Sequence, residues 1–151
     1  MSISVFVDTP TNKTKILLVD DNEIIRIFFR DVFWLHGLDD NFDLKLASGV
    51  EEAQKIIQDP STRPDIIFLD LVMPMKKGET TVTSSEAGFF LLKEIKENPA
   101  YKNIKVIIFS SYSDKGSMDQ AKKAGADMFL TKEEHLPQDL VRVVEGLTKK
   151  T

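Results

Sequence analysis

The sequence predicts an α/β protein with an open parallel sheet and helices on both faces of that sheet. Short apolar runs typical of buried strands alternate five times with segments whose apolar residues have helical spacing. A chain of 151 residues fits one domain of this kind. We therefore expect right-handed connections between the strands and a ligand site outside their carboxyl ends.

The predicted strands and helices follow one another in strict alternation. The strands are expected at residues 15–21, 42–47, 64–70, 103–111 and 127–132. The helices are expected at residues 22–37, 49–60, 86–99, 117–126 and 136–150. Asn22 or Asp21 can cap the start of the first helix, and Gly37 can end it. The last helix is expected to carry one apolar stripe made of Leu136, Leu140, Val144 and Leu147.

Two polar segments do not fit this alternation. Residues 1–12 are turn-rich and predict an N-terminal arm before a domain at residues 13–151. The apolar side chains of this arm leave open a short docked strand; they are Ile3, Val5, Phe6 and Val7. The stretch 76–85 is too polar for a core and predicts an irregular segment, either a solvated loop or an element that contacts a partner.

Composition and charge exclude several classes of protein. The net charge of −4 argues against nucleic-acid binding, which normally needs a basic patch. The absence of cysteine excludes disulfides and thiol chemistry. No apolar run approaches the length of a membrane span, and the first residues do not resemble a secretory signal. These features predict a soluble cytoplasmic protein.

Polar side chains of complementary chemistry stand at the ends of the predicted strands. Asp20 and Asp21 end the first strand, and Asp70 ends the third. Ser110 ends the fourth, and Lys132 ends the fifth. Crowded carboxylates repel one another and suit a hard cation such as Mg²⁺, while a lysine and a serine suit phosphoryl oxygens. Each residue alone has an ordinary structural explanation, such as a helix cap or a turn, so the prediction of a phosphoryl site depends on their combination.

At these strand ends the sequence resembles the receiver domain of two-component response regulators. The resemblance covers roughly residues 13–149 and is carried by LLVDDN (17–22), IIFLDLVMP (66–74), VIIFSS (106–111) and GADMFLTK (125–132). It implies a flavodoxin-like, doubly wound, five-stranded parallel sheet with strand order 2-1-3-4-5.

The resemblance also implies a role for each residue of the site. Asp70 would be the phosphoacceptor, and Lys132 would pair with the phosphoryl group. The ligands of Mg²⁺ would be Asp20, Asp21, Asp70 and the backbone carbonyl of Val72. Ser110 and Phe129 would form the conformational switch, in which the hydroxyl turns toward the phosphoryl group and the aromatic ring moves inward.

The sequence departs from the family pattern at three places near this site. Gly78 and Gly88 both resemble one family glycine, which implies an insertion at residues 76–87. Glu133 stands where a proline usually follows the lysine, and this leaves open whether the Lys132–Glu133 peptide is cis. Val72 is apolar where the family commonly has a polar side chain.

The resemblance implies a stand-alone signalling protein, not an enzyme, that is a monomer or weak dimer. Its phosphodonor would be a histidine kinase or a histidine phosphotransfer protein, docked partly on the first helix near Ile24, Ile25 and Ile27. Its output would be contact with a downstream protein, through a face expected to expose Lys115, Lys122, Lys123 and Arg142.

Three other classes of protein are alternatives to a response-regulator receiver. A hydrolase with an aspartate nucleophile needs a second aspartate where Val72 stands. A flavin- or nucleotide-binding protein needs a glycine-rich phosphate loop where the sequence has DDNEII. A pseudo-receiver, which binds partners without being phosphorylated, stays open as the alternative.

Overall fold

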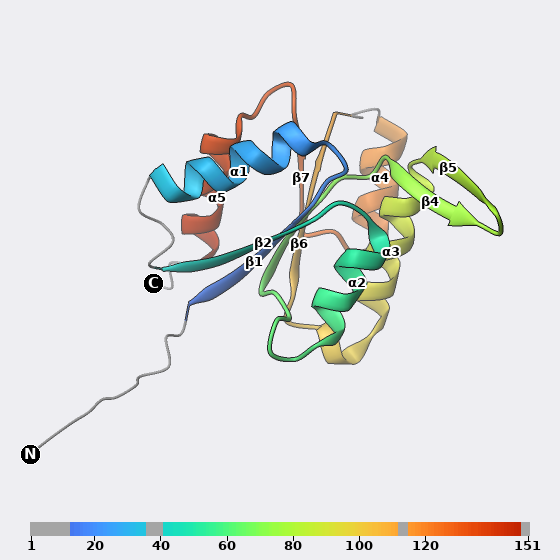
Figure 1. The fold of residues 1–151 in the computed structure, drawn as a ribbon, viewed down its shortest axis with the longest axis horizontal. Coiled ribbons are helices and arrows are strands. Elements are labelled where there is room, and N and C mark those ends of the chain that lie inside the picture. The colour runs from blue at the N-terminus through green and yellow to red at the C-terminus, as the bar shows by residue number, and fades with distance from the viewer. Residues whose placement is uncertain (1–12, 36–40, 112–114, 149–151) are drawn as a thin grey trace, which may run out of the picture.

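The computed structural model describes residues 13–35, 41–111 and 115–148, and it confirms the predicted open α/β architecture (Figure 1). Five parallel strands form the sheet in the order β2-β1-β3-β6-β7. Counted along the chain, this is the predicted order 2-1-3-4-5. The strands are β1 (Thr14–Val19), β2 (Phe42–Ala47), β3 (Ile66–Leu69), β6 (Lys105–Ser110) and β7 (Met128–Thr131).

Helices cover both faces of this sheet, as Figure 1 shows. One face packs on α1 (Glu23–Leu35) and α5 (Pro137–Thr148). The other face packs on α2 (Val50–Gln58), α3 (Glu86–Glu97) and α4 (Lys115–Lys123), with a 3₁₀ turn at Pro99–Tyr101 after α3. Among the described helices, none has the length and apolar character needed to cross a membrane.

The central strands are buried on both faces, which explains their continuous apolar runs. Leu17 and Val19 of β1 point into one apolar cluster, whereas Ile16 and Leu18 point into the other. All four residues of β3, Ile66–Leu69, are likewise buried. Polar side chains therefore appear only where the chain leaves the sheet, at the strand ends.

The start of α1 is capped by Asn22, one of the two residues predicted for this role. The Oδ1 atom of Asn22 accepts hydrogen bonds from the backbone N–H groups of Ile24 at 2.9 Å and Ile25 at 3.4 Å. Asp21 is consequently not needed as a cap. The predicted stop at Gly37 lies outside the described residues.

The prediction of an irregular segment at 76–85 is wrong. The chain there forms an antiparallel hairpin of β4 (Met73–Lys77) and β5 (Thr80–Ser84) (Figure 1). Lys77 pairs with Thr80, so only two residues make the turn, and the first of them is Gly78 with φ +66°. The hairpin forms because β5 is rich in β-branched residues, which favour strands, and because Met73 and Met75 of β4 pack against the core.

The predicted apolar stripe of the last helix is wrong at its first residue. Leu136 precedes α5 and is 56% exposed. Its backbone N–H donates to Asp139 Oδ2 at 2.9 Å, which gives it a role at the start of the helix in place of a role in the core. Leu140 and Val144 are buried and Leu147 packs against the core, as predicted.

A glycine is required where α3 meets the loop that follows β3. Gly88 N donates to Leu71 O at 3.0 Å, and a Cβ atom at Gly88 would lie 2.4 Å from Leu71 Cα and 2.8 Å from Asp70 O. No side chain fits at such distances, so the first turn of α3 lies directly against the backbone of Asp70 and Leu71.

We expect Gly88→Ala to lower the free energy of unfolding by about 1–3 kcal/mol, because the added methyl group displaces the backbone of a packed loop. Gly146→Ala is the matched control: it lies within α5 with no atom within 4 Å of its Cβ position. This control should raise stability by about 0.5–1 kcal/mol. Urea denaturation of the wild type and both variants measures these changes in the free energy of unfolding. Equal free energies of unfolding for the two variants would contradict the close approach of Gly88 to the backbone of Asp70 and Leu71.

Candidate acidic site at the strand ends

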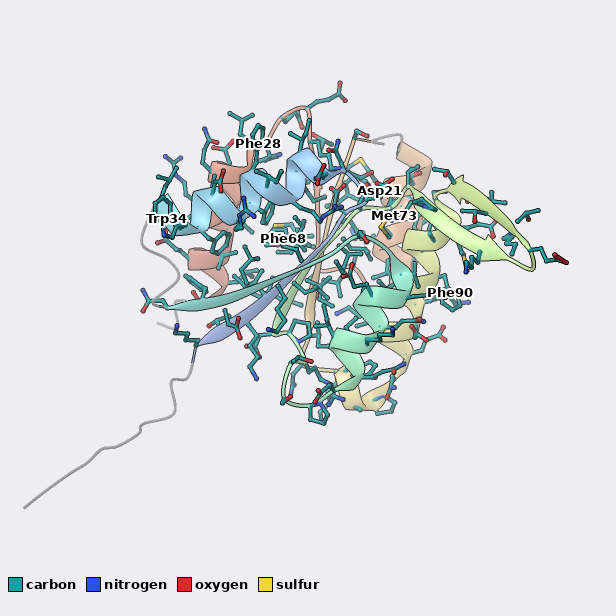
Figure 2. All side chains as sticks on the ribbon, viewed as in Figure 1. Asp21, Phe28, Trp34, Phe68, Met73 and Phe90 are labelled. Atoms are coloured by element: carbon teal, nitrogen blue, oxygen red, sulfur yellow. The ribbon has the colours of Figure 1, made fainter. Side chains whose placement is uncertain are left out.

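Two neighbouring strands bring three carboxylates together. Val19 of β1 pairs with Leu69 of β3, so the residues that follow these two ends emerge side by side. Carboxylate oxygens of Asp20, Asp21 and Asp70 all lie within 4.8 Å of one another. Asp20 is fully buried, Asp70 is 5% exposed and Asp21 is exposed. Figure 2 shows Asp21 at the end of the sheet from which the hairpin leaves.

Lys132 is the cation of this cluster. Its Nζ atom lies 2.6 Å from Asp20 Oδ2 and 3.4 Å from Asp70 Oδ2, and only 15% of its side chain is exposed. Its backbone N–H donates to Ser110 O at 2.9 Å, and its ammonium group lies 5.7 Å from the centre of the Phe109 ring. The Lys132–Glu133 peptide, which the sequence left open, is trans.

Backbone contacts hold the two buried carboxylates in place. Asp20 Oδ1 accepts a hydrogen bond from Asn22 N at 2.9 Å, and Asp70 N donates to Val19 O at 2.9 Å. Arg26 reaches back from α1 and donates from Nη1 to the carbonyl of Asp20 at 2.7 Å. Arg26 was not among the site residues predicted from the sequence, because no residue pattern predicts a contact with a backbone carbonyl.

Burial of these carboxylates disfavours their charged forms. Burial and the neighbouring charge of Asp20 raise the pKa of Asp70 to about 6, against the opposing effect of Lys132. Burial also raises the pKa of Asp20, although Lys132 and the Asn22 N–H partly offset it. When all three carboxylates are ionised, one lysine leaves the cluster with a net charge of −2 (three negative, one positive).

The residues fit a hard divalent cation. Oδ2 of Asp20 is buried, and the Lys132 ammonium group that pairs with it at 2.6 Å is shared with Asp70. One shared cation leaves the two buried carboxylates with a net negative charge, which a metal ion can neutralise. Oxygen ligands from two or three carboxylates, one of them exposed, are the donor set that Mg²⁺ and Mn²⁺ accept.

The other predicted site residues lie at the ends of the same sheet strands or next to them in the chain. Ser110 is fully buried at the carboxyl end of β6. Phe129 of β7 pairs with Ile108 of β6 and is half-buried against the core. Val72 is half-buried and follows Asp70 by two residues, in the short connection between β3 and β4. The structure therefore brings together Asp20, Asp21, Asp70 and Lys132, and it places Ser110 beside them through the backbone bond to Lys132.

The comparison with known families agrees with this geometry. The family described as "Response regulator receiver domain" matches residues 16–145, and the chain belongs to this family. Receiver domains take phosphoryl groups from histidine kinases and act on downstream targets, within two-component signalling.

Individual relatives span nearly the whole chain. The chain is 29% identical over 136 residues to the chemotaxis protein CheY of Halobacterium salinarum. The aligned region covers 89% of this chain and 97% of that protein. It is 27% identical to the response regulator Rcp1 of Synechocystis, over 87% of this chain and 84% of that protein. A crystal structure of the Mn²⁺-bound form of Rcp1 superposes with a TM-score of 0.68 at 26% identity, covering 89% of this chain and 91% of that one.

We expect the metal-free protein to become more stable as the pH falls from 7 toward 5. The pKa of Asp70 is about 6 in the folded protein and near 3.8 in the unfolded chain, so the folded state holds this proton more tightly. The free energy of unfolding therefore falls as the pH rises from the lower of these pKa values to the higher. Between pH 5 and pH 7 the expected loss is about 1.4 kcal/mol, because this range covers about one pH unit below the folded-state pKa and one pKa unit corresponds to about 1.4 kcal/mol.

Urea denaturation in EDTA, at pH 7 and pH 5, measures this dependence. Asp70→Asn should be the more stable protein at pH 7 and should show a smaller gain on acidification. The same pH dependence in both proteins would contradict the raised pKa of Asp70.

Proposed function

We propose that this chain is a stand-alone receiver that accepts a phosphoryl group on Asp70 in a Mg²⁺-dependent reaction. The observation that carries the proposal is the position of Lys132, whose ammonium group lies between Asp20 and Asp70 within a cluster of three carboxylates. A strand-end aspartate beside a cation site and a lysine is the arrangement that phosphoryl transfer to a carboxylate requires.

In the proposed reaction, a carboxylate oxygen of Asp70 attacks the phosphorus atom of a phosphohistidine. The N–P bond breaks, its electron pair returns to the imidazole, and Asp70 becomes an acyl phosphate. The carboxyl group must be ionised to attack, and a pKa of about 6 leaves it largely ionised at pH 7. Lys132, already within 3.4 Å of Asp70 Oδ2, binds a phosphoryl oxygen, and the Ser110 hydroxyl donates to another.

The Mg²⁺ ion would be held by Asp20, Asp21 and Asp70 together with the backbone carbonyl of Val72. A bound Mg²⁺ ion would neutralise negative charge on the phosphoryl group and fix the orientation of that group. Rcp1, a relative at 26% identity, is known in a Mn²⁺-bound form, which supports the binding of a divalent cation by this chain. The crowding of buried carboxylates in this chain supports it independently.

Phosphorylation is proposed to act outward through Ser110 and Phe129. Ser110 ends β6, and Phe129 lies on the adjacent strand β7, paired with Ile108 two residues before Ser110. A movement of the Ser110 hydroxyl toward the phosphoryl group therefore shifts the end of β6, and this shift is passed to the paired strand β7, which carries the Phe129 ring. The face beyond this pair exposes charged side chains suited to a downstream protein, namely Lys115, Lys122, Lys123 and Arg142.

The phosphodonor is proposed to be a histidine kinase or a histidine phosphotransfer protein in the cytoplasm. Beside the acidic cluster, α1 exposes Ile24 at 59% and Phe28 at 50% (Figure 2), an apolar surface that a partner helix can cover. Ile25 and Ile27, named with Ile24 from the sequence, are half-buried. We further propose that residues 13–151 form the receiver, a monomer or weak dimer, and that an insertion at residues 76–87 supplies most of the β4–β5 hairpin, which begins at Met73.

We expect acetyl phosphate to give a phosphoryl adduct in the presence of Mg²⁺ and none in EDTA, measured by intact-protein mass spectrometry. The adduct should be absent from Asp70→Asn, because that side chain carries the nucleophilic oxygen. Asp119→Asn, an exposed aspartate of α4, is the matched control and should be phosphorylated like the wild type.

Failure of a folded, Mg²⁺-binding wild type to form any adduct with acetyl phosphate or with phosphorylated histidine phosphotransfer protein would overturn the proposal. The pseudo-receiver, which binds partners without phosphorylation, would then be the better description.

A further inference from the structure

The outer strand of the hairpin has an open edge. β5 is paired with β4 on one side, and its other side pairs with no strand among the residues that the structure describes. Residues 80–83 of β5 are exposed, and Figure 1 shows the hairpin extending outward from the domain. Natural proteins usually protect such an edge with charged side chains, a proline or a bulge. β5 has the sequence TTVTS and carries neither charge nor proline, so its sequence does not prevent a further strand from pairing with it.

The position of Pro74 defines which backbone groups of β5 face this edge. Pro74 of β4 pairs with Thr83, and proline has no N–H group to donate, so these two residues form a non-hydrogen-bonded pair. Hydrogen-bonded and non-hydrogen-bonded pairs alternate along an antiparallel ladder. The N–H and C=O groups of Thr81 and Thr83 therefore point away from β4, toward the open edge. Since β4 itself lies against α3, the hairpin can be extended on the side of β5.

We propose that β5 of one copy of the chain pairs with β5 of a second copy, antiparallel and about a two-fold axis at Val82. In this register Thr81 lies opposite Thr83 of the second copy, and both use their outward-facing backbone groups for hydrogen bonds across the axis. The Val82 side chains of the two copies lie directly opposite each other. Threonine pairs stabilise antiparallel strands, and like charges directly opposite destabilise them. No like charges meet in this register, because Glu79 lies opposite Ser85 of the second copy.

The sequence of β5 favours a second copy as the partner strand. A two-fold contact requires a surface that is complementary to itself, and TTVTS has hydroxyl side chains on both sides of its central valine. Val82 pairs with Met75 within the hairpin, so the axis brings the valines and methionines of both copies into one row. Val82 is 38% exposed in the single chain, and this row shields it from water. A hairpin of two strands is marginally stable in water, and a sheet of four strands with an apolar row is more stable.

The direction of the hairpin leaves room for the second domain. Because the paired strands run antiparallel, the two domains are attached at opposite ends of the β5 pair. Each hairpin extends away from its own domain, so its tip lies beside the base of the other hairpin (Figure 1). The contact consists of two short strands, so we expect a weak dimer. This inference does not depend on the proposed phosphoryl transfer.

Light scattering of the full chain tests the dimer. The mass should rise from that of one chain toward that of two chains as the concentration increases from micromolar to millimolar. Val82→Lys should stay monomeric over this range, because the two lysines would face each other across the axis. Met118→Lys places the same charge at a similarly exposed apolar side chain of α4; it is the matched control and should dimerise like the wild type. An equimolar mixture of Val82→Lys and Val82→Glu should dimerise again, which also shows that both variants are folded.

Cysteine variants test the register, since the chain has no cysteine of its own. Val82→Cys should form a disulfide between copies on mild oxidation, because the Cα atoms of a directly opposed, non-hydrogen-bonded pair lie about 4.5 Å apart. Thr81→Cys is the matched control, since the two Thr81 positions lie diagonally across the axis, about 7–8 Å apart, which is too far for a disulfide. We expect Val82→Cys to cross-link about ten-fold faster than Thr81→Cys.

A monomeric mass at every concentration would overturn the proposal. Loss of the dimer in Met118→Lys, together with its persistence in Val82→Lys, would also overturn it and assign the contact to α4. Equal rates of cross-linking in the two cysteine variants would contradict the two-fold axis at Val82.

Discussion

The site depends on the burial of negative charge at the end of two adjacent strands. Asp20 and Asp70 follow β1 and β3, whose own residues are entirely apolar at that end, so the two carboxylates are shielded from water. Such charges are costly unless they are paired. Lys132 supplies one positive charge for both, and it is itself held by the backbone bond to Ser110 and the ring of Phe109. One lysine cannot balance three carboxylates, and this imbalance is the physical basis of the proposal that the site binds a divalent cation.

The loop that follows Asp70 is fixed by packing on both sides. Gly88 brings the first turn of α3 against the backbone of Asp70 and Leu71, and Leu71 and Met73 are fully buried. The hairpin begins at Met73 and is joined to α3 by the ion pair of Lys77 with Glu86 at 2.5 Å. The hairpin is thus attached directly to the loop that carries Asp70, and Figure 1 shows it extending outward from the domain, with β4 against α3. A protein that approaches Asp70 from this side meets the hairpin.

Most of the sheet could be predicted because buried parallel strands leave an unambiguous pattern. The runs IIFLD and VIIFSS show where a strand ends, since burial excludes polar residues until the chain reaches the sheet edge. The strand ends in turn predicted which four charged side chains come together. The hairpin was missed because β5 is almost wholly exposed and polar, and because β4 buries apolar side chains only at Met73 and partly at Met75, so hydrophobic periodicity gives little indication of it. Gly78 looked like a family glycine, but its role is the hairpin turn. Arg26 was missed because its contact is with a backbone carbonyl, which no residue pattern predicts.

The stability of the folded protein as a function of Mg²⁺ concentration tests the central claim most directly. Urea unfolding at pH 7 should show a free energy of unfolding that rises with Mg²⁺, by about 2.7 kcal/mol when Mg²⁺ exceeds its dissociation constant a hundred-fold, and that returns to the metal-free value in EDTA. Asp21→Asn, which removes the exposed carboxylate of the cluster, should need more Mg²⁺ for the same gain. An unfolding midpoint that is independent of Mg²⁺ in the wild type would contradict the account, because the crowded carboxylates would then not bind the cation.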